Sequence, residues 1–523
     1  MAQSRGFAWF VRLPAGRGGA RFQGMSDVIS RRGFLAATSA AALLPGMAMA
    51  GAPAVSLRPV ARSREGGKLL VESADALVAE AGLGKAVTGY AVADLKTGQM
   101  LETGAGGTGL PPASVAKAIT ALYALDTLGG DYRFATRLLA TGPVVNGEIK
   151  GDLVLAGGGD PTLDTDGLAA MARDLKAAGV TGVKGRFLIW GGALPYMREI
   201  DGEQPDHVGY NPAISGLALN FNRVHFEWKR KGQGWGVTMD ARSEKYRPEV
   251  RVARMAVVKR RAPVYTYRDK GGLDDWTVAR GALGNGGSRW LPVRRPDLYC
   301  GEVLRYFARA QGIALKEGEV VTILPAGSVM VQRPSAPLRE VLGDMLKYST
   351  NLTAEMVGLA ATHRRKGAAV SIKASAAEMS AWARGALGMQ GARLVDHSGL
   401  GAASNVSAMD MVRALVAAGR APLLRPIMKD IHMRDDNGRV DKAHPIKVQA
   451  KTGTLNFVSG LAGYMTAADG TDLAFAVFSA DEARRARLSE AQRERPEGGR
   501  SYTRRAKQLQ QRLIERWGAI YGS

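Results

Sequence analysis

Pro112-Ala113-Ser114-Val115-Ala116-Lys117 leads into an apolar run, residues 118–128, which ends at Gly129-Gly130. Within this run apolar side chains recur at three- and four-residue steps, the period of a helix with one buried face. A pair of glycines is a common helix end. We therefore expect a buried helix here, with Ser114 in its first turn.

Ser114 and Lys117 are three residues apart, so both lie on the same face of this helix. A serine hydroxyl is a weak nucleophile until a base takes its proton, and a lysine amine removed from water has a depressed pKa and can be that base. The helix N-terminus adds N–H groups that favour an oxyanion. The pair indicates a serine acyl-transfer centre, although a Ser-x-x-Lys spacing also arises by chance and serine is a common helix cap.

Two further motifs distinguish these interpretations. Ser349-Thr350-Asn351 is the only Ser-x-Asn of the chain, and Lys451-Thr452-Gly453-Thr454 follows it. This order of three motifs is shared by penicillin-binding proteins and serine β-lactamases. A second Lys-Thr-Gly, residues 96–98, precedes Ser114 and lies between two alternating runs, so we interpret it as part of a hairpin turn.

Two other patterns lack the context that their functional interpretation requires. Residues 104–109 spell the Gly-x-Gly-x-x-Gly of a dinucleotide site, but no βαβ unit surrounds them, so we expect a loop. Asp396-His397-Ser398-Gly399-Leu400 suggests a Ser-His-Asp triad, but the chain lacks Gly-x-Ser-x-Gly. The histidines show no metal-ligand spacing, so we expect neither a metal nor another cofactor.

The chain has 523 residues, which predicts two or three domains. Ser114 and Ser349 are 235 positions apart, more than a compact catalytic domain needs. From about residue 140 short strand patterns predominate. We expect a catalytic domain in two parts, residues 55–140 and 331–523, interrupted by one or two β-rich domains over residues 141–330.

The second catalytic part is predicted to begin with helices over residues 338–349 and 353–363, so that the Ser-x-Asn motif falls at their junction. A strand is expected over residues 454–464, and the motif that begins at Lys451 leads into it. We expect this strand to pair with a second one over residues 472–478.

The C-terminal part is predicted to end in a charged loop, residues 482–500, and a basic amphipathic helix, residues 502–521. Such a helix can bind a membrane surface. We expect it to pack on the catalytic sheet instead.

Residues 1–50 have the features of an export signal. Ser30-Arg31-Arg32-Gly33-Phe34-Leu35 precedes an apolar run and the cleavage pattern Ala48-Met49-Ala50. This resembles a twin-arginine signal, which directs folded proteins to the bacterial periplasm. An uncleaved anchor is the alternative, and Met25 is an alternative start. The remaining chain has no apolar stretch long enough to span a membrane.

The formal net charge of +23 points to an anionic partner. Nucleic acid is the usual partner of such a basic chain. An exported protein meets cell-wall polymers instead, so we expect weak, salt-sensitive attraction to the wall and no nucleic-acid binding. The single cysteine, Cys300, excludes an intrachain disulfide.

Together the motifs resemble the D-alanyl-D-alanine carboxypeptidases of the class C low-molecular-mass penicillin-binding type, which carry a large insertion between the first two motifs. Residues 157–163, 215–222 and 396–400 are also similar to family stretches, although the family more often has glycine at His397. The resemblance implies an α+β fold of the DD-peptidase/β-lactamase kind, with an antiparallel sheet between helical layers. It also implies cleavage of D-Ala-D-Ala, or of D-Ala–diaminopimelate cross-links, in peptidoglycan, and inhibition by β-lactam antibiotics.

The resemblance also assigns roles to the first two motifs. Ser114 would attack the carbonyl carbon and form an acyl-enzyme, with Lys117 as the base. Ser349 would relay the proton to the leaving amine. Asn351 would hold Lys117 and the substrate amide.

The third motif would bind the substrate. Lys451 and the hydroxyls of Thr452 and Thr454 would hold the C-terminal carboxylate, with Gly453 between them. The backbone N–H groups of Ser114 and Thr454 would form the oxyanion hole.

Two alternatives remain at this point. A serine β-lactamase uses the same motifs, but its first two motifs usually lie close together, unlike those of this chain. A non-catalytic wall-binding protein that retains the motifs by descent is the other. Formation of a stable acyl adduct with penicillin distinguishes the carboxypeptidase from both.

Overall fold

The computed structural model describes residues 71–523, with the exceptions of 370, 436 and 523. The export signal expected at residues 1–50 lies outside the described residues. Within them, no helix is long and apolar enough to cross a membrane.

A six-stranded antiparallel sheet contains the Lys-Thr-Gly motif. Its strand order is β19-β20-β21-β22-β1-β2. The strands are β1 (Val87–Asp94), β2 (Met100–Gly104), β19 (Lys429–Asp430), β20 (Lys447–Leu455), β21 (Val458–Thr466) and β22 (Asp472–Ala480). Because β1 pairs with β22, segments from both sides of the expected insertion share one sheet.

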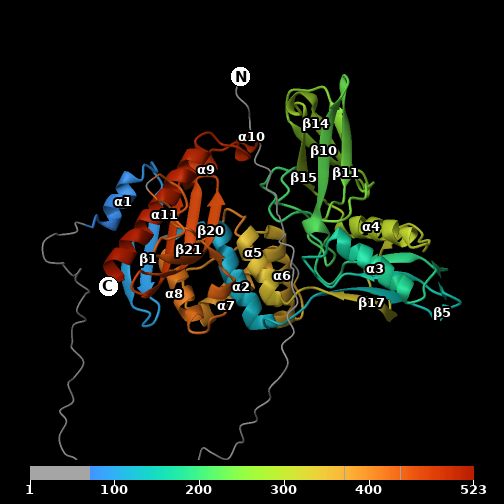
Figure 1. The fold of residues 1–523 in the computed structure, drawn as a ribbon, viewed down its shortest axis with the longest axis horizontal. Coiled ribbons are helices and arrows are strands. Elements are labelled where there is room, and N and C mark those ends of the chain that lie inside the picture. The colour runs from blue at the N-terminus through green and yellow to red at the C-terminus, as the bar shows by residue number, and fades with distance from the viewer. Residues whose placement is uncertain (1–70, 370, 436, 523) are drawn as a thin grey trace, which may run out of the picture. The chain divides into compact units, whose positions relative to one another are not determined.

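Helices cover both faces of this sheet (Figure 1). One face packs against α1 (Ala74–Glu80) and α11 (Gly499–Tyr521), and the other against α2 (Ala116–Leu128) and α8 (Ala408–Gly419). Three more helices pack on α2: α5 (Leu338–Tyr348), α6 (Asn351–Lys366) and α7 (Ile372–Leu387). Residues of β22 alternate between the two hydrophobic cores, as expected for a strand buried on both faces. The predicted α+β fold is confirmed, and so is the packing of the C-terminal helix on the sheet.

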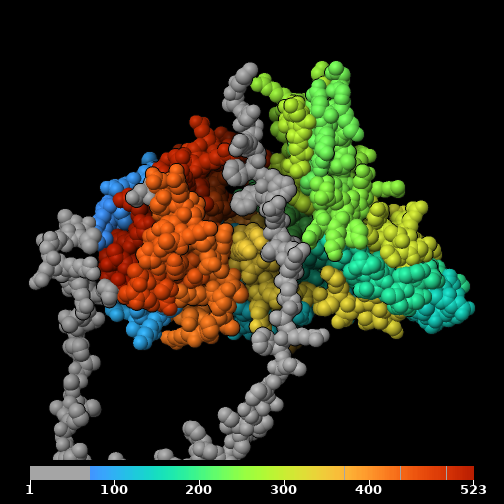
Figure 2. All heavy atoms as spheres, in the orientation of Figure 1, coloured from blue at the N-terminus to red at the C-terminus, as the bar shows by residue number. Residues whose placement is uncertain are grey.

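The segment between the first two motifs builds a separate hydrophobic core. Its main sheet has the order β16-β9-β7-β4-β17, and two three-stranded sheets have the orders β11-β10-β15 and β12-β14-β13. The strands β10 to β15 form the green column that stands out in Figure 2. The elements are β4 (Ala135–Ala140), β5 (Val144–Val145), β6 (Glu148–Ile149), β7 (Leu153–Ala156), α3 (Thr165–Ala177), β8 (Gly182–Val183), β9 (Phe187–Trp190), η2 (Asn220–Asn222), β10 (Arg223–Lys231), β11 (Gly234–Asp240), β12 (Ala253–Val258), β13 (Tyr265–Asp269), β14 (Asp274–Ala279), η3 (Arg280–Ala282), β15 (Gly286–Pro292), α4 (Pro296–Ala310), β16 (Gly318–Val320) and β17 (Ser328–Pro334).

The sheet pairing suggests slightly wider limits for this segment than residues 141–330. Strand β4 pairs with β17 along its whole length, and both belong to the five-stranded sheet. We propose that the inserted region extends from about residue 135 to about residue 334.

The predicted strand over residues 454–464 is wrong. Strand β20 ends at Leu455, Asn456-Phe457 forms a two-residue turn, and β21 begins at Val458. Phe457 has a φ of 56° although it is not glycine, and its buried ring packs on Tyr502. Since neither glycine nor proline marks the turn, the sequence resembles one continuous strand.

Two other expectations about the C-terminal part also need correction. Strand β22 pairs with β21 and β1, not with the strand that carries Lys451. Residues 482–500 include two short helices, α9 (Glu482–Ala486) and α10 (Glu490–Arg493), where a loop was expected. The remaining short elements are β3 (Gly109–Leu110), β18 (Val406–Ser407), η1 (Ala113–Val115) and η4 (Arg425–Ile427).

Candidate active site

Ser114 lies in the 3-10 turn η1, which continues directly into α2. This turn is enclosed because β20 and β21 both pack against it. Lys117, one turn later, is fully buried in the centre of the domain. The predicted arrangement, a hydroxyl beside a buried amine at a helix start, is therefore present.

The Lys117 amine has three oxygen partners. Its Nζ lies 2.9 Å from Ser114 Oγ, 2.8 Å from Asn351 Oδ1 and 2.8 Å from the Ser398 carbonyl. The last two can only accept hydrogen bonds, whereas the Ser114 hydroxyl can donate. A neutral amine would donate to the two acceptors and take the Ser114 proton on its lone pair, so the geometry suits a base.

Burial also makes the neutral amine more accessible than it is in an exposed lysine. Burial lowers the pKa of Lys117 to about 8, while the nearby carboxyl groups of Asp396 and Glu355 limit the decrease. Loss of hydration is the cause, because the charged ammonium is the form that burial penalises.

The Ser-x-Asn motif lies at the junction of α5 and α6, as predicted. Ser349 ends α5 in the left-handed region, with a φ of 59°, and Asn351 begins α6. Asn351 Nδ2 donates to the Tyr210 carbonyl at 3.0 Å. This bond sets the amide orientation, so that Oδ1 faces Lys117.

Lys451 completes the cluster from β20. Its side chain is buried, and Nζ donates to Ser349 Oγ at 3.0 Å and to the Thr452 carbonyl at 2.7 Å. Burial lowers the pKa of Lys451 well below its usual range, with the Lys117 charge as a second cause. The first motif is thus hydrogen-bonded to Asn351 and the third motif to Ser349, so the Ser-x-Asn motif joins the other two.

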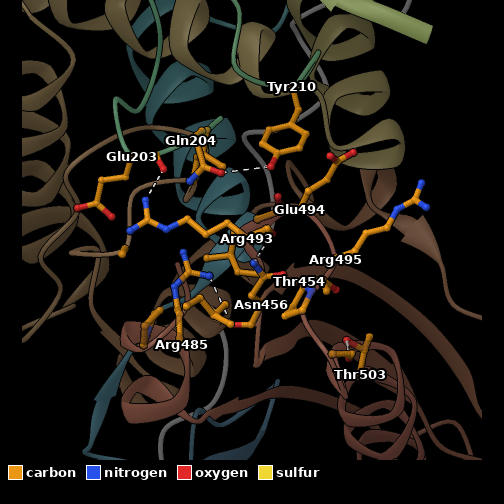
Figure 3. A pocket seen from close by; sticks show the side chains of 18 of the residues that line it. Glu203, Gln204, Tyr210, Thr454, Asn456, Arg485, Arg493, Glu494, Arg495 and Thr503 are labelled. Carbon is orange, nitrogen blue, oxygen red and sulfur yellow. Dashed lines mark hydrogen bonds between the residues drawn. The ribbon is translucent and has the colours of Figure 1, made fainter. Parts of the chain in front are cut away.

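A cleft of about 1480 Å³ opens over this cluster. Ser114, Ser349 and Asn351 line it, and the third motif reaches it through Thr454. Figure 3 shows its far wall, where Tyr210 and the segment after β22 meet. A substrate in the cleft would reach all three motifs.

Gly453 lets β20 approach the nucleophile turn. A Cβ at this position would lie 2.6 Å from the Pro112 carbonyl oxygen and 3.1 Å from the Val115 nitrogen. The glycine of the motif therefore serves close packing beside Ser114, in addition to the substrate-binding part expected from sequence.

Replacement of Gly453 by alanine is expected to displace η1 or β20 and to lower kcat/KM by about 10²-fold, since small misplacements of reacting groups have effects of that size. D-Ala release from a peptide ending in D-Ala-D-Ala measures it. The control is Gly385→Ala in α7, where an added Cβ meets nothing within 4 Å. Equal activity of the two variants would contradict the packing role.

Glu355 is a site residue that the sequence analysis missed. It is fully buried on α6, and its carboxylate accepts the N–H groups of His397 at 3.0 Å and Ser398 at 2.8 Å. Burial raises its pKa to about 8. Glu355 thus fixes the backbone just before the carbonyl that holds Lys117, and Asp396 fixes the peptide of that carbonyl by accepting the Gly399 N–H at 2.6 Å. The available signal was an acidic side chain four residues after Asn351, on the same helix face.

The segment around His397 is structural in this fold. His397 is buried, its Nε2 lies 2.7 Å from Ser375 Oγ, and burial lowers its pKa to about 3. Gly358 leaves room for the ring, because a Cβ there would lie 2.2 Å from it. His397 has no hydrogen bond to Ser114, so a Ser-His-Asp triad is excluded.

Replacing Glu355 with glutamine should loosen the backbone at residues 397 and 398 and slow acylation about tenfold or more, because an amide presents one oxygen in place of two. Its loss also removes a charge that raises the pKa of Lys117, so the inflection of the acylation rate should move to lower pH. The pH profile of benzylpenicillin labelling tests this. An unmoved inflection with reduced rate would mean that Glu355 only supports folding.

A buried Ser-Lys pair beside Ser-x-Asn and Lys-Thr-Gly-Thr, on an antiparallel sheet between helical layers, defines a penicillin-binding type of acyl-transfer protein. The chain belongs to the D-Ala-D-Ala carboxypeptidase 3 (S13) family, which it matches over residues 70–495.

Individual relatives agree with this assignment. The chain is 28% identical over 511 residues to a D-alanyl-D-alanine carboxypeptidase of Actinomadura sp., covering 90% of this chain and 88% of that protein. It is 24% identical over 417 residues to the D-alanyl-D-alanine carboxypeptidase DacB of Haemophilus influenzae, and the match covers 75% of this chain and 84% of that protein. The solved structure of penicillin binding protein 4 from that organism matches with a TM-score of 0.66 at 20% identity, over 78% of this chain and 93% of that one. This last likeness concerns the fold.

Proposed function

We propose that this protein is a serine D-Ala-D-Ala carboxypeptidase that cleaves peptidoglycan stem peptides through an acyl-enzyme on Ser114. The observation that carries the proposal is the buried Lys117 amine, 2.9 Å from Ser114 Oγ and held by two acceptors. Family membership supplies the substrate class. The same attack on a D-Ala–diaminopimelate cross-link would be an endopeptidase activity.

Acylation begins when neutral Lys117 takes the proton of Ser114. The Ser114 oxygen attacks the carbonyl carbon of the penultimate D-Ala, and the N–H groups of Ser114 and Thr454 stabilise the oxyanion by about 3 kcal/mol each. Ser349 relays the proton from Lys117 to the departing amine, and the bond between the two D-Ala residues breaks. Water then hydrolyses the ester and restores Ser114.

The C-terminal carboxylate of the substrate is expected to bind at the third motif. Lys451 and the hydroxyls of Thr452 and Thr454 would bind it, and the Asn351 amide would bind the substrate backbone. Because burial and the neighbouring Lys117 charge disfavour the charged form of Lys451, an incoming carboxylate would favour its protonation. Binding of the carboxylate and charging of Lys451 thus support each other.

The test is the intact mass of the protein after incubation with benzylpenicillin, followed by peptide mapping and by an assay of D-Ala release. A persistent adduct on Ser114 together with D-Ala release is the expected result. Rapid hydrolysis of the drug without an adduct would identify a β-lactamase. An unmodified protein and unchanged drug would identify a wall-binding protein.

Acylation should depend on pH through Lys117. With a pKa of about 8, about a tenth of the amine is neutral at pH 7. The neutral form is the base, so the second-order rate constant for labelling by benzylpenicillin should rise about tenfold per pH unit below 8 and level off above it. This rate constant is measured by quenching the labelling reaction at set times and determining the fraction of labelled protein by mass spectrometry. A flat profile between pH 6 and 9 would assign the proton transfer to another group.

We also propose that the protein is exported to the periplasm by its twin-arginine signal and is drawn weakly to the anionic wall. Basic residues are concentrated in the sequence over residues 229–270, which span β10 to β13 of the column in Figure 2. Sedimentation with purified peptidoglycan at low and high salt would measure this attraction.

A further inference from the structure

A second pocket lies at the tip of the column that β10 to β15 form in Figure 2. It lies among three segments: residues 229–235 around the turn from β10 to β11, residues 259–264 between β12 and β13, and residues 280–285 between β14 and β15. The strand pairing places all three segments at the same end of the column. The pocket has a volume of about 400 Å³ and shares no lining residue with the active-site cleft, so it is a separate site.

The charge of this pocket is positive on every side. Every charged residue in the three segments is basic. Four of these cations line the pocket: Arg230, Lys259, Arg260 and Arg280. Among the described side chains, none of the four belongs to an ion pair, because the carboxylates of the neighbouring strands pair with other basic residues, namely Lys229, Arg242, Arg254 and Lys270. The protein therefore leaves this concentration of positive charge without a counter-charge.

The half-buried indole ring of Trp235 holds two of the guanidinium groups in place. Its Nε1 donates to the Gly284 carbonyl at 3.0 Å, which fixes the ring to the third segment. The guanidinium carbons of Arg230 and Arg280 lie 4.5 Å and 5.3 Å from the ring centroid, where the π-electrons attract cations. Two like charges are thus held close together, and a bound anion would relieve their repulsion.

These side chains also keep hydrogen-bond donors for a ligand. Arg230 donates through Nε to a carbonyl of its own turn at 3.1 Å, and Arg280 donates through Nη2 to another carbonyl of that turn at 3.4 Å. The hydrogen bonds of the described residues include none from the two Nη atoms of Arg230 or from Nζ of Lys259. Arg260 differs, because it donates to the Thr277 hydroxyl at 2.7 Å and to nearby carbonyls, so it supplies mainly charge.

We propose that this pocket binds a phosphate group, carried either by a lipid headgroup or by a soluble phosphorylated compound. The inference goes beyond the proposed function, because it concerns neither the active-site cleft nor the cleaved peptide. A guanidinium binds phosphate through paired, charge-assisted hydrogen bonds. A phosphate group carries more charge and more acceptor oxygens than a carboxylate, which suits cations that converge from three segments. A pocket lined by one sign of charge also concentrates anions.

Two probes test the pocket in the full chain. Isothermal titration calorimetry at constant ionic strength measures the Kd of pyrophosphate, and sedimentation measures binding to phosphatidylcholine vesicles with and without phosphatidic acid. The double variant Arg230→Gln, Arg280→Gln should weaken pyrophosphate binding about tenfold or more. Lys259→Gln, which leaves the contacts of Trp235 intact, should weaken it about threefold. Citrate, whose similar charge resides on carboxylates, should bind the wild type about tenfold more weakly than pyrophosphate.

The double variant Lys231→Gln, Arg261→Gln is the matched control. It removes the same charge from exposed residues of the same tip that do not line the pocket, and its Kd should equal that of the wild type. Vesicle binding that needs phosphatidic acid and is lost in the pocket variants identifies a lipid headgroup. Pyrophosphate binding without vesicle binding identifies a soluble compound. Binding of neither probe, equal binding of citrate, or an equal loss in the control overturns the pocket.

Discussion

Ser114→Ala is expected to abolish D-Ala release and labelling by benzylpenicillin, with a loss of at least about 10⁴-fold in kcat/KM. No other group can form the acyl-enzyme in the proposed mechanism. The change removes one half-buried hydroxyl, and Lys117 keeps its acceptors at Asn351 and Ser398. The melting temperature should therefore shift by only a few degrees. Steady-state kinetics, intact mass and calorimetry measure the three quantities.

Ser501→Ala is the control for this variant. Ser501 lines the same cleft, but its hydroxyl donates to the Gly498 carbonyl and has no bond to Lys117. It should be labelled and active like the wild type. Labelling of the Ser114→Ala variant would show that another residue is the nucleophile.

The sequence predicts the contact between Ser114 and Lys117 because helical geometry is local. Three-residue spacing places both groups on one face whatever the rest of the chain does. The contacts of Asn351 with Lys117, and of Lys451 with Ser349, join residues that are 234 and 102 positions apart. No local rule gives such contacts. Resemblance to a family predicted that Asn351 holds Lys117, and the packing of α6 on α2 brings these two residues together. The contact of Lys451 with Ser349 was not predicted.

Features that depend on burial were not predictable from local patterns. The Asn456-Phe457 turn lacks glycine and proline, and packing of Phe457 against Tyr502 stabilises its unusual backbone. Glu355 looks like an ordinary helix residue until the fold shows that its carboxylate is buried beside the peptide of Ser398. In both cases long-range packing outweighs the local preference.

Lys117→Met is expected to lose activity as completely as Ser114→Ala, because a nucleophile and its base act as a unit. Unlike the serine variant, it should also change how the stability depends on pH. Methionine replaces the volume but not the charge, so the buried carboxyl groups of Glu355 and Asp396 lose the cation that lowers their pKa values. Kinetics and calorimetry of the two variants side by side measure the difference.

Relative to the wild type, the variant should lose stability as the pH rises. In the wild type the pKa of Lys117 falls from 10.5 to about 8 on folding, so the lysine opposes folding most strongly below pH 8 and less at higher pH. The variant has no lysine at this position, so its stability does not gain from deprotonation of residue 117 above pH 8. The pKa of Glu355, about 8 in the native state, rises further without Lys117. The loss of stability that begins near the ordinary pKa of 4.5 and ends near pH 8 in the wild type therefore continues to a higher pH in the variant. Both effects have the same sign, so the melting-temperature difference from the wild type should be larger at pH 9 than at pH 6.

For Ser114→Ala, which removes no titrating group, the difference should be the same at both pH values. An equal or smaller difference for Lys117→Met at pH 9 would mean that the charge of Lys117 does not stabilise the buried carboxyl groups.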